Sequence, residues 1–473
     1  MGAGASTHQT VVAGDNPVAV GLDPTAPDGT SPARRQGLAL GKTLAKTVAH
    51  FFPELPAWLK ETRDTRDQDR ITYSRSFLLW MGLMAFLLKL GSRRQVRFEL
   101  DSPAALANLN RLARAEQEAM AHSDTLDHFL GHVPPASLAK LRRQMVHRLL
   151  RMKALDRGRL FGHFLVVIDA TGQLHFRQRH CPHCLEQVHG SQTLYFHNVL
   201  EAKLVTPDGL AISLDSEFIE NTDPKATKQD CELKAFVRLA ERLKRDYPQL
   251  LLCLGFDGLY TNGTVMDICR KNHWKYIITF KEGSLPALWT DYQALLNLCP
   301  RNRKTHCTDE GVKQTLAWVG QLEHVDDQKR QHRVNAFPCR EETATKTTLF
   351  AWLTNWSITS DTVVALANLG GRCRWKIENE GFNIQKNGGF NLEHAYSTGE
   401  RQIRNFYILL QIAHLLLQLV ERGSLLTQEA GKLFGSLKGM ARRLAESIRN
   451  VLIPADAIDS ALAAKIQIRL NSS

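Results

Sequence analysis

A short apolar run that ends on a carboxylate limits what this chain can fold into. In Phe161–Gly172 (FGHFLVVIDATG), the residues from Phe164 to Ile168 are apolar and largely β-branched, and a glycine follows soon after. Four or five apolar residues bounded by a turn signal predict a buried strand. Asp169 would then stand at the exit of that strand, where an ionised carboxylate is costly unless a metal ion or another cation lies beside it.

A second apolar run ends in the same way, because Leu250–Gly255 (LLLCLG) leads directly into Asp257. If the hairpin between the two runs folds back over one edge of a sheet, the two runs lie side by side and Asp169 and Asp257 become neighbours. The predicted order is β-β-β-α-β-α-β: strands at 164–168, Tyr195–Val205, Leu210–Ile219, Leu250–Gly255 and Lys275–Phe280, a helix that begins at Asp223-Pro224 or Thr227 and ends at Pro248, and a helix over Asn262–His273.

The charge of the chain favours a polyanionic partner. Lys and Arg exceed Asp and Glu by 12, and the pI is about 9.3. A surplus of this size favours nucleic acid first and an anionic membrane second, although a soluble basic protein without such a partner has the same composition. Nine cysteines in 473 residues are too few for a disulfide scaffold, so we expect a reducing compartment.

No segment predicts a membrane anchor. The N-terminal stretch lacks a basic segment followed by an apolar one, so we expect no signal peptide. The most apolar window, Phe77–Leu88, falls short of the roughly 20 residues that span a bilayer, and we interpret it and Ile403–Leu419 as core helices. We therefore expect a cytoplasmic protein with no membrane partner.

The motifs around the acids resemble those of bacterial insertion-sequence transposases of the DDE class. The likeness rests on V-V-I-D-A-T-G at Asp169, G-F-D-G-L-Y-T-N-G at Asp257 and R-W-K-I-E-N-E-G-F-N over 374–383. It covers roughly residues 160–420. Such proteins have an RNase H-like catalytic core that a β-stranded insertion interrupts before the third acid, which implies a mixed, α+β fold class for this chain.

On this basis the chain divides into six parts. We expect a disordered N-terminal tail (1–35), a helical, DNA-binding domain (36–159), the first part of an RNase H-like core (160–299), a β-rich insertion (300–357), the second part of the core (358–422) and a basic helical C-terminal tail (423–473). Solvated helix surfaces explain the basic residues of the helical domain as well as DNA binding does. These residues are Arg93, Arg94, Arg97, Arg111, Arg114, Lys140, Arg142, Arg143, Arg148, Arg151 and Lys153.

The third acid follows from the resemblance. In this family the glutamate after Arg-Trp-x-Ile is a metal ligand, which implies Glu378, and Glu380 is the reserve choice. With Asp169 and Asp257 it would hold Mg²⁺ or Mn²⁺, and two ions are expected for phosphodiester displacement. The implied reaction is hydrolysis of a DNA strand at the end of the element, followed by attack of the freed 3′-hydroxyl on another phosphodiester. The partners would be the element ends and the target DNA, and a homodimer or higher oligomer would hold two ends together.

The family signature is matched only in part. It reads Tyr, two residues, Arg, three residues, Glu, six residues, Lys, and Arg374 and Glu378 fit it. The Tyr position is Gly371 and the Lys position is Gln385, while Lys386 stands one residue late, about 100° further round a helix. Either Lys386 contacts phosphate through a local shift, or this contact is lost.

Two further DNA contacts are implied, each with a structural alternative. Arg374 would clamp a backbone phosphate, or would pair with Glu378 one helical turn away. Relatives with the full signature cut through a hairpin whose flipped base stacks on an aromatic residue of the β-insertion. Here that residue would be Trp318, which could equally be a core residue of the insertion.

A cluster of cysteine and histidine residues predicts a structural zinc site. Cys-x-x-Cys supplies half of the four ligands that Zn²⁺ needs, and the alternative is free thiols and surface histidines. The predicted ligands are His180, Cys181, His183 and Cys184, and the nearby His175, His189 and His197 could supply others.

Two other functions fit the same motifs. A nuclease or resolvase of the same fold would cut DNA without joining strands. A catalytically inactive descendant would bind DNA only. The presence of all three acids favours an active enzyme.

Overall fold

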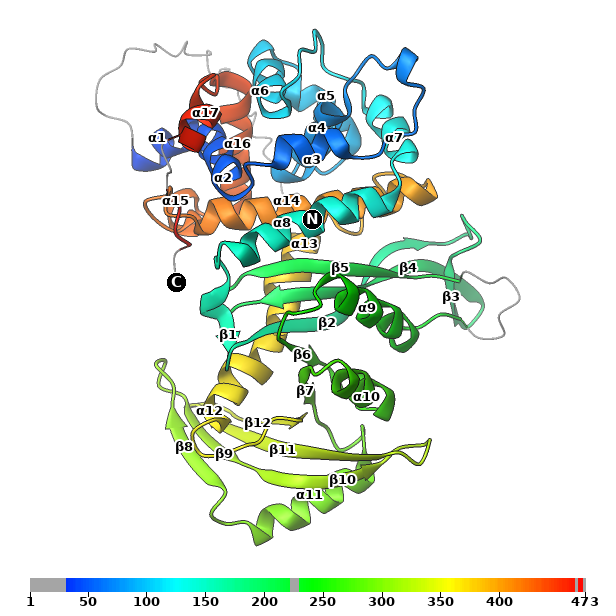
Figure 1. Ribbon diagram of the computed structural model, residues 1–473, viewed down its shortest axis with the longest axis vertical. Helices are drawn as coiled ribbons and strands as arrows, with labels where there is room; N and C mark the ends of the chain where they lie inside the picture. The colour runs from blue at the N-terminus through cyan, green and yellow to red at the C-terminus, as the bar shows by residue number, and fades with distance from the viewer. Residues whose placement is uncertain (1–30, 222–228, 464–466, 471–473) are drawn as a thin grey trace, which may run out of the picture.

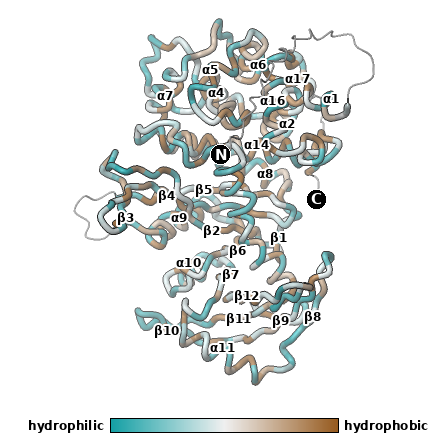
Figure 2. The backbone as a smooth tube through the Cα atoms, turned by 180° about the vertical axis from the view of Figure 1, so that it is seen from behind, coloured by the Kyte–Doolittle hydropathy of each residue, from teal (hydrophilic) through white to brown (hydrophobic). Residues whose placement is uncertain are grey.

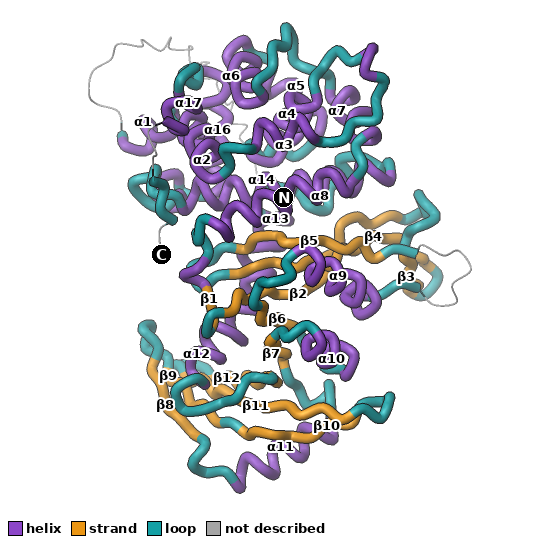
Figure 3. Tube along the Cα trace, in the orientation of Figure 1, coloured by secondary structure: helices purple, strands orange, loops and turns teal. Residues whose placement is uncertain are grey.

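One mixed sheet runs through most of the molecule, with a helical layer at one end (Figures 1 and 3). The computed structural model describes residues 31–221, 229–463 and 467–470. The order of the hydrogen-bonded strands is β3-β4-β2-β6-β7-β12-β11-β9-β8, and β5 pairs with β4, β1 with β2 and β10 with β11. The strands are β1 (Arg159–Leu160), β2 (His163–Phe176), β3 (Leu185–His189), β4 (Gln192–Val205), β5 (Ala211–Ile219), β6 (Leu252–Phe256), β7 (Lys275–Thr279), β8 (Arg303–Cys307), β9 (Lys313–Ala317), β10 (Val319–Val325), β11 (Gln331–Glu342) and β12 (Thr347–Thr354). The chain is therefore of the mixed α/β class.

The two apolar runs singled out in the sequence are neighbouring strands. β2 and β6 pair in parallel, with Val166 opposite Leu254 and Val167 opposite Gly255. The hairpin of β4 and β5 lies on the other side of β2, because β4 pairs with β2 and β5 with β4. The predicted adjacency of the first and fourth strands is confirmed.

The helical layer combines both ends of the chain. The basic C-terminal segment contributes a helix, α16, whose buried Met440, Leu444 and Ile448 face α1, α2 and α6. This segment is thus part of the helical layer. The layer consists of α1 (Pro32–Leu38), α2 (Leu40–Phe51), α3 (Leu55–Glu61), α4 (Arg75–Leu87), α5 (Arg93–Leu100), α6 (Pro103–Ala113), α7 (Ser123–His132), α8 (Pro135–Arg151), α15 (Ala430–Phe434), α16 (Leu437–Asn450) and α17 (Ala457–Ala463).

One predicted boundary needs correction, and another falls outside the described residues. Residues 1–30 of the predicted disordered tail lie outside the described residues, but helix α1 begins at Pro32, before the expected boundary at 35, because Ser31 caps it and proline suits a first turn. The predicted helix start at Asp223-Pro224 or Thr227 also lies outside the described residues. The described helix α9 spans Glu232–Asp246.

A long apolar helix, α14 (Glu400–Arg422), lies between the helical layer and the sheet (Figure 1). It packs against α4, α7 and α8 on one side and β5 on the other. It is the one helix among the described residues that is long and apolar enough to cross a membrane, and 94% of its apolar window is buried inside the protein. In Figure 2 the hydrophobic segments, coloured brown, run through this end of the molecule, whereas outer turns such as the one after β10 are hydrophilic.

An irregular helix lies in the segment between β12 and α14. It begins as α12 (Val363–Ala365), widens to π-helix in η4 (Leu366–Gly371), tightens in η5 (Arg372–Trp375), widens again in η6 (Ile377–Asn383) and ends as α13 (Ile384–Asn387). Short π-helical turns inside helices occur frequently at functional sites. Contacts of η6 with β2, β4 and β5 place this helix against the strand that carries Asp169.

Gly371 sets how closely this helix approaches strand β12. A Cβ atom at this position would collide with the indole ring of Trp352 on β12. Trp352 is buried among Phe337, Phe350 and their neighbours, so its ring cannot move aside. This close packing explains why a glycine stands at position 371, where the transposase signature has a tyrosine.

We expect Gly371→Ala to destabilise the protein by about 1–3 kcal/mol, because overpacking a filled core forces side chains out of position. Chemical denaturation with guanidinium chloride measures the change. The matched control is Gly431→Ala in helix α15, where an added Cβ meets nothing within 4 Å. Equal stability of the two variants would contradict the packing role of Gly371.

Candidate active site

Two carboxylates lie at matching positions of the paired strands β2 and β6. The register that sets Val167 opposite Gly255 brings Asp169, two residues on, level with Asp257. Asp169 belongs to β2, and Asp257 follows the last residue of β6 and caps a single 3₁₀ turn by accepting a hydrogen bond from the Leu259 N–H at 2.9 Å. The strand predicted to end at Asp169 continues to Phe176, so Asp169 lies within β2, and the parallel pairing brings it beside Asp257 at the end of β6.

Arg374 joins the third acid to the first. One of its amino nitrogens lies 2.8 Å from Glu378 Oε1, and the other lies 3.3 Å from Asp169 Oδ2. The Arg374 side chain is only 10% exposed, and its guanidinium lies 4.6 Å from the centre of the half-exposed Trp375 ring. In the structure Arg374 therefore pairs with Glu378, as one of the two interpretations of the sequence expected, and with Asp169 as well.

The pKa of Asp169 reflects its burial and the charged groups beside it. Burial raises the pKa of Asp169 to about 7; Arg374 acts against this rise, while the carboxylates of Glu378 and Asp257 add to it. An additional cation near the three acids would lower the pKa again. Asp169 would therefore ionise more readily with a cation bound beside it.

Glu378 and Glu380 face different partners. Glu378 shares Arg374 with Asp169, whereas Glu380 Oε1 lies 3.1 Å from Lys376 Nζ. Among the charged groups that shift the pKa of Asp169, Glu378 is present and Glu380 is not. The structure thus brings Glu378, the first choice from the sequence, into the cluster.

Two residues of this site were not assigned from the sequence. Tyr260 donates a hydrogen bond to Glu232 Oε2 at 3.3 Å. Burial raises the pKa of Glu232, and the neighbouring Asp257 raises it further. Tyr260 lies in the G-F-D-G-L-Y motif three residues after Asp257, whereas Glu232 stands in the first turn of α9, where an acid is common without any site. It is a fourth acid beside the site.

The other residues expected to contact DNA lie in different surroundings. The Lys386 Nζ atom pairs with Glu393 Oε1 at 2.7 Å. Gln385, at the Lys position of the signature, is buried and bonds to Gln411 and His414. Trp318 is 8% exposed and belongs to the hydrophobic core formed with β9, β11 and β12. It is therefore a core residue, which is one of the two interpretations of the sequence.

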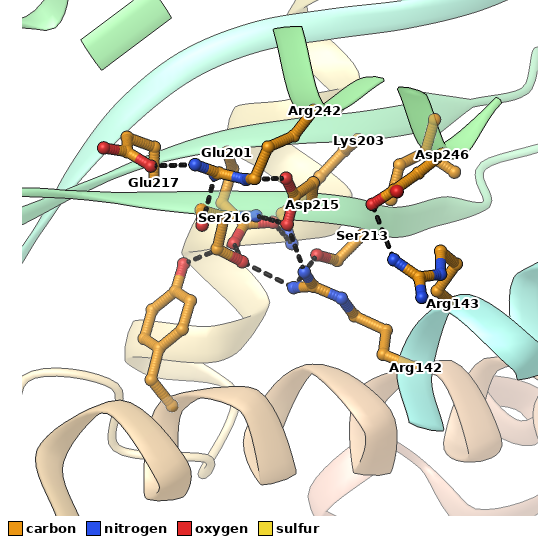
Figure 4. Close-up of polar contacts among 12 residues, drawn as sticks. Arg142, Arg143, Glu201, Lys203, Ser213, Asp215, Ser216, Glu217, Arg242 and Asp246 are labelled. Carbon is orange, nitrogen blue, oxygen red and sulfur yellow. Dashed lines mark hydrogen bonds and ion pairs between the residues drawn. The ribbon is translucent and has the colours of Figure 1, made fainter. Parts of the chain in front are cut away.

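One of the basic residues predicted to face DNA or solvent does neither. Arg142 on α8 is 2% exposed and reaches across to β5, where it donates to Ser213 at 3.0 Å, to Ser216 at 2.5 Å and to Asp215 at 2.8 Å (Figure 4). Its neighbour Arg143 pairs with Asp246 at the end of α9 at 2.8 Å. These contacts fix α8, and with it the helical layer, on the sheet.

The same network continues beneath Asp169. Glu201, the partner of Asp169 across β2 and β4, is fully buried and lies 3.2 Å from Lys203 Nζ. Tyr407 on α14 donates to Glu201 at 3.0 Å, and Lys203 donates to Gln411 Oε1 at 2.6 Å. Burial lowers the pKa of Lys203, and Glu201 opposes this shift. This interior is polar, and its charges are paired.

The predicted zinc cluster is present with one change of ligand. Among the described residues, the ligand atoms of His180, Cys181, Cys184 and His197 all lie within 4.8 Å of one another. His183 is not in this group: its Nδ1 lies 2.9 Å from the Asn221 carbonyl oxygen, which turns the ring away. The three acids do not form so tight a group, since Arg374 lies between Asp169 and Glu378.

Comparisons with known proteins add no family to this geometry. No protein-family model matches the chain, and no curated protein matches its sequence.

We expect the stability of the metal-free protein to fall as the pH rises from about 4 to about 7. A folded-state pKa of about 7, against 3.8 when unfolded, means that folded Asp169 keeps its proton where the unfolded chain loses it. Asp169→Asn removes this effect, so its stability relative to wild type should rise by about 2 kcal/mol between pH 5 and pH 8. Denaturation in EDTA at the two pH values measures this difference, with the exposed Asp361→Asn as control. A difference that stays constant with pH would refute the raised pKa.

Proposed function

We propose that this protein is a DNA transposase of the DDE class, which catalyses divalent-metal-dependent DNA strand cleavage and strand transfer. The observation that carries the proposal is the parallel register of β2 and β6, which sets Asp169 level with Asp257, together with the Arg374 link to Glu378. These are the acids of the three motifs that resemble insertion-sequence transposases. We infer that β2, β4, β5, β6 and β7 form an RNase H-like core and that β8 to β12 form its insertion.

The chemistry of the three acids suits Mg²⁺ or Mn²⁺. Hard divalent cations take oxygen ligands, and Mg²⁺ is commonly held by one or two carboxylates together with substrate phosphate. Burial is the main cause of the raised pKa of Asp169, and a cation bound beside this carboxylate would offset it. Asp169, Asp257 and Glu378 would hold the ions. When bound, two such ions activate the attacking oxygen and stabilise the leaving oxygen of a phosphodiester.

The residues around the acids would bind and orient the DNA. Arg374 lies where a guanidinium released from its two carboxylates can donate two hydrogen bonds to one phosphate. Trp375 presents an exposed ring beside it. Asp169 must lose its proton before it can act as a ligand, so cation binding strengthens as the pH rises toward about 7.

The helical layer would supply a second DNA-binding surface. With Arg142 and Arg143 committed to acids of the sheet and α9, other cations of 36–159 remain exposed. A net charge of +12 favours binding to the phosphate backbone, with affinity that falls as salt rises. We infer that two copies or more assemble on paired element ends in the bacterial cytoplasm. These exposed cations include Arg94, Arg97, Arg114, Lys140, Arg151 and Lys153.

A cleavage and joining assay tests the function. Full-length protein is incubated with Mg²⁺ or Mn²⁺, DNA carrying the ends of the element and a target plasmid, and the nicked and joined products are separated on denaturing gels. We expect both products from wild type. Asp169→Ala, Asp257→Ala and Glu378→Gln should each lower cleavage at least about 100-fold, because bound metal supplies several kcal/mol of transition-state stabilisation.

Glu380→Gln is the matched control, since Glu380 stands two residues from Glu378 on the same helix and pairs with Lys376. It should cleave at a rate close to wild type. Cleavage that survives both aspartate substitutions would overturn the catalytic proposal. Cleavage without any joined product would identify a nuclease or resolvase, and DNA binding without cleavage by wild type would identify an inactive descendant.

A further inference from the structure

Two thiols and two imidazoles meet where the connection between β2 and β3 folds back onto β4. His180, Cys181 and Cys184 belong to this connection, and His197 belongs to β4, where it lies opposite Leu174 of β2. We propose that these four residues bind one Zn²⁺ as a structural site. The proposal does not rest on transposase activity, because none of the four residues belongs to the acidic cluster.

Four of the six distances between ligand atoms are close to those of a tetrahedral zinc centre. Ligands at 2.3 Å for sulfur and 2.0–2.1 Å for nitrogen, arranged tetrahedrally, lie about 3.8 Å apart for two sulfurs and about 3.5 Å apart for sulfur and nitrogen. The two Sγ atoms are 3.6 Å apart, and His197 Nε2 lies 3.4 Å from Cys181 Sγ and 3.6 Å from Cys184 Sγ. His180 Nδ1 lies 3.2 Å from Cys184 Sγ. The group is therefore already close to the shape of the ion's coordination shell.

The surroundings of His197 favour the required ring orientation. Its Nε2 faces the thiols, and its Nδ1 faces the buried carboxylate of Glu220 at 3.8 Å. Arg404 of α14 pairs with the same carboxylate and holds it in place. A zinc-bound histidine almost always directs its other ring nitrogen to a carboxylate, a carbonyl or water, which fixes the tautomer. Glu220 is suited to this supporting role.

His183 has the spacing of a ligand but a different partner. Besides the Nδ1 contact with the Asn221 carbonyl, its Nε2 lies 3.9 Å from Glu400 of α14. The Asn221 N–H donates to the His183 carbonyl at 3.1 Å, and the Asn221 side chain donates to the Cys184 carbonyl at 3.0 Å. His183 thus connects the loop to the residues after β5 and leaves the fourth position to His197.

The site is distinct from the acidic cluster. His197 lies level with Leu174, five residues along β2 from Asp169, which is roughly 16 Å at 3.3 Å per residue. Four protein ligands leave no open position for a substrate, as in structural rather than catalytic zinc sites. Bound zinc would join the β2–β3 connection to β4 and so stabilise the outer end of the sheet that carries Asp169.

The test measures metal content and ligand type in the full-length protein, purified without a metal-affinity tag. Elemental analysis should find about one zinc per chain in wild type. Replacement by Co²⁺ should produce the absorption of a tetrahedral site with thiolate ligands, a readout that requires no substitution. Removal of zinc by a chelator should lower the melting temperature, because metal binding and folding are coupled.

Four variants identify the ligands. His197→Gln and Cys184→Ser should weaken zinc binding at least about 100-fold, whereas His183→Gln and the exposed Cys231→Ser should retain one zinc. Asp169→Asn should also retain zinc while losing strand cleavage, which separates this site from the proposed function. The inference is overturned if wild type binds no zinc when supplied with excess Zn²⁺, if His183→Gln loses zinc while His197→Gln keeps it, or if Cys181 and Cys184 form a disulfide.

Discussion

The guanidinium of Arg374 lies between two carboxylates that would otherwise repel each other, and the surrounding fold holds all three groups in place. Asp169 is fixed by the pairing of β2 on both sides, and Glu378 by a helix that packs closely on Trp352 through Gly371. The position of each acid is thus set by its own packing contacts. Arg374 supplies part of the positive charge beside these acids, and burial keeps the pKa of Asp169 high enough for it to hold a proton below about pH 7.

Buried ion pairs stand within the otherwise hydrophobic contact between the helical layer and the sheet. Arg142 enters a buried site lined by Asp215 and two serines, and Lys203 with Glu201 lies deeper still. A buried ion pair contributes little net stability, but removing one partner leaves an unpaired charge and is strongly destabilising. These pairs therefore restrict α8 to one position on β5, which in turn fixes the helical layer relative to the strand that carries Asp169.

Local patterns in the sequence predicted where several strands lie, but not how far β2 extends. Apolar runs and turn residues act over a few positions, so β2, β6 and the β4–β5 hairpin could be found from them, whereas the adjacency of β2 and β6 also required the hairpin to fold back over one edge of the sheet. Asp169, expected at the exit of its strand, lies inside β2, because pairing with β4 continues to Phe176. Contacts between distant residues could not be predicted in the same way. The exchange of His183 for His197 depends on Asn221, and the burial of Arg142 depends on Asp215, and neither partner is close in sequence. The contact of Tyr260 with Glu232 likewise required the start of α9 to be placed beside the turn that follows β6.

The wide turns of the helix over 363–387 bear on how its length can change. A π-helical turn closes its hydrogen bond one residue later than an α-helical turn, so it holds one additional residue for the same rotation. Lys386 stands one position beyond the lysine of the transposase signature, and most of η6, which begins just before Glu378 and ends at Asn383, separates it from Glu378. A single inserted residue is accommodated in such a turn without rotating the rest of the helix by 100°. One residue can therefore be inserted at this point while the side chains that follow keep the same face of the helix.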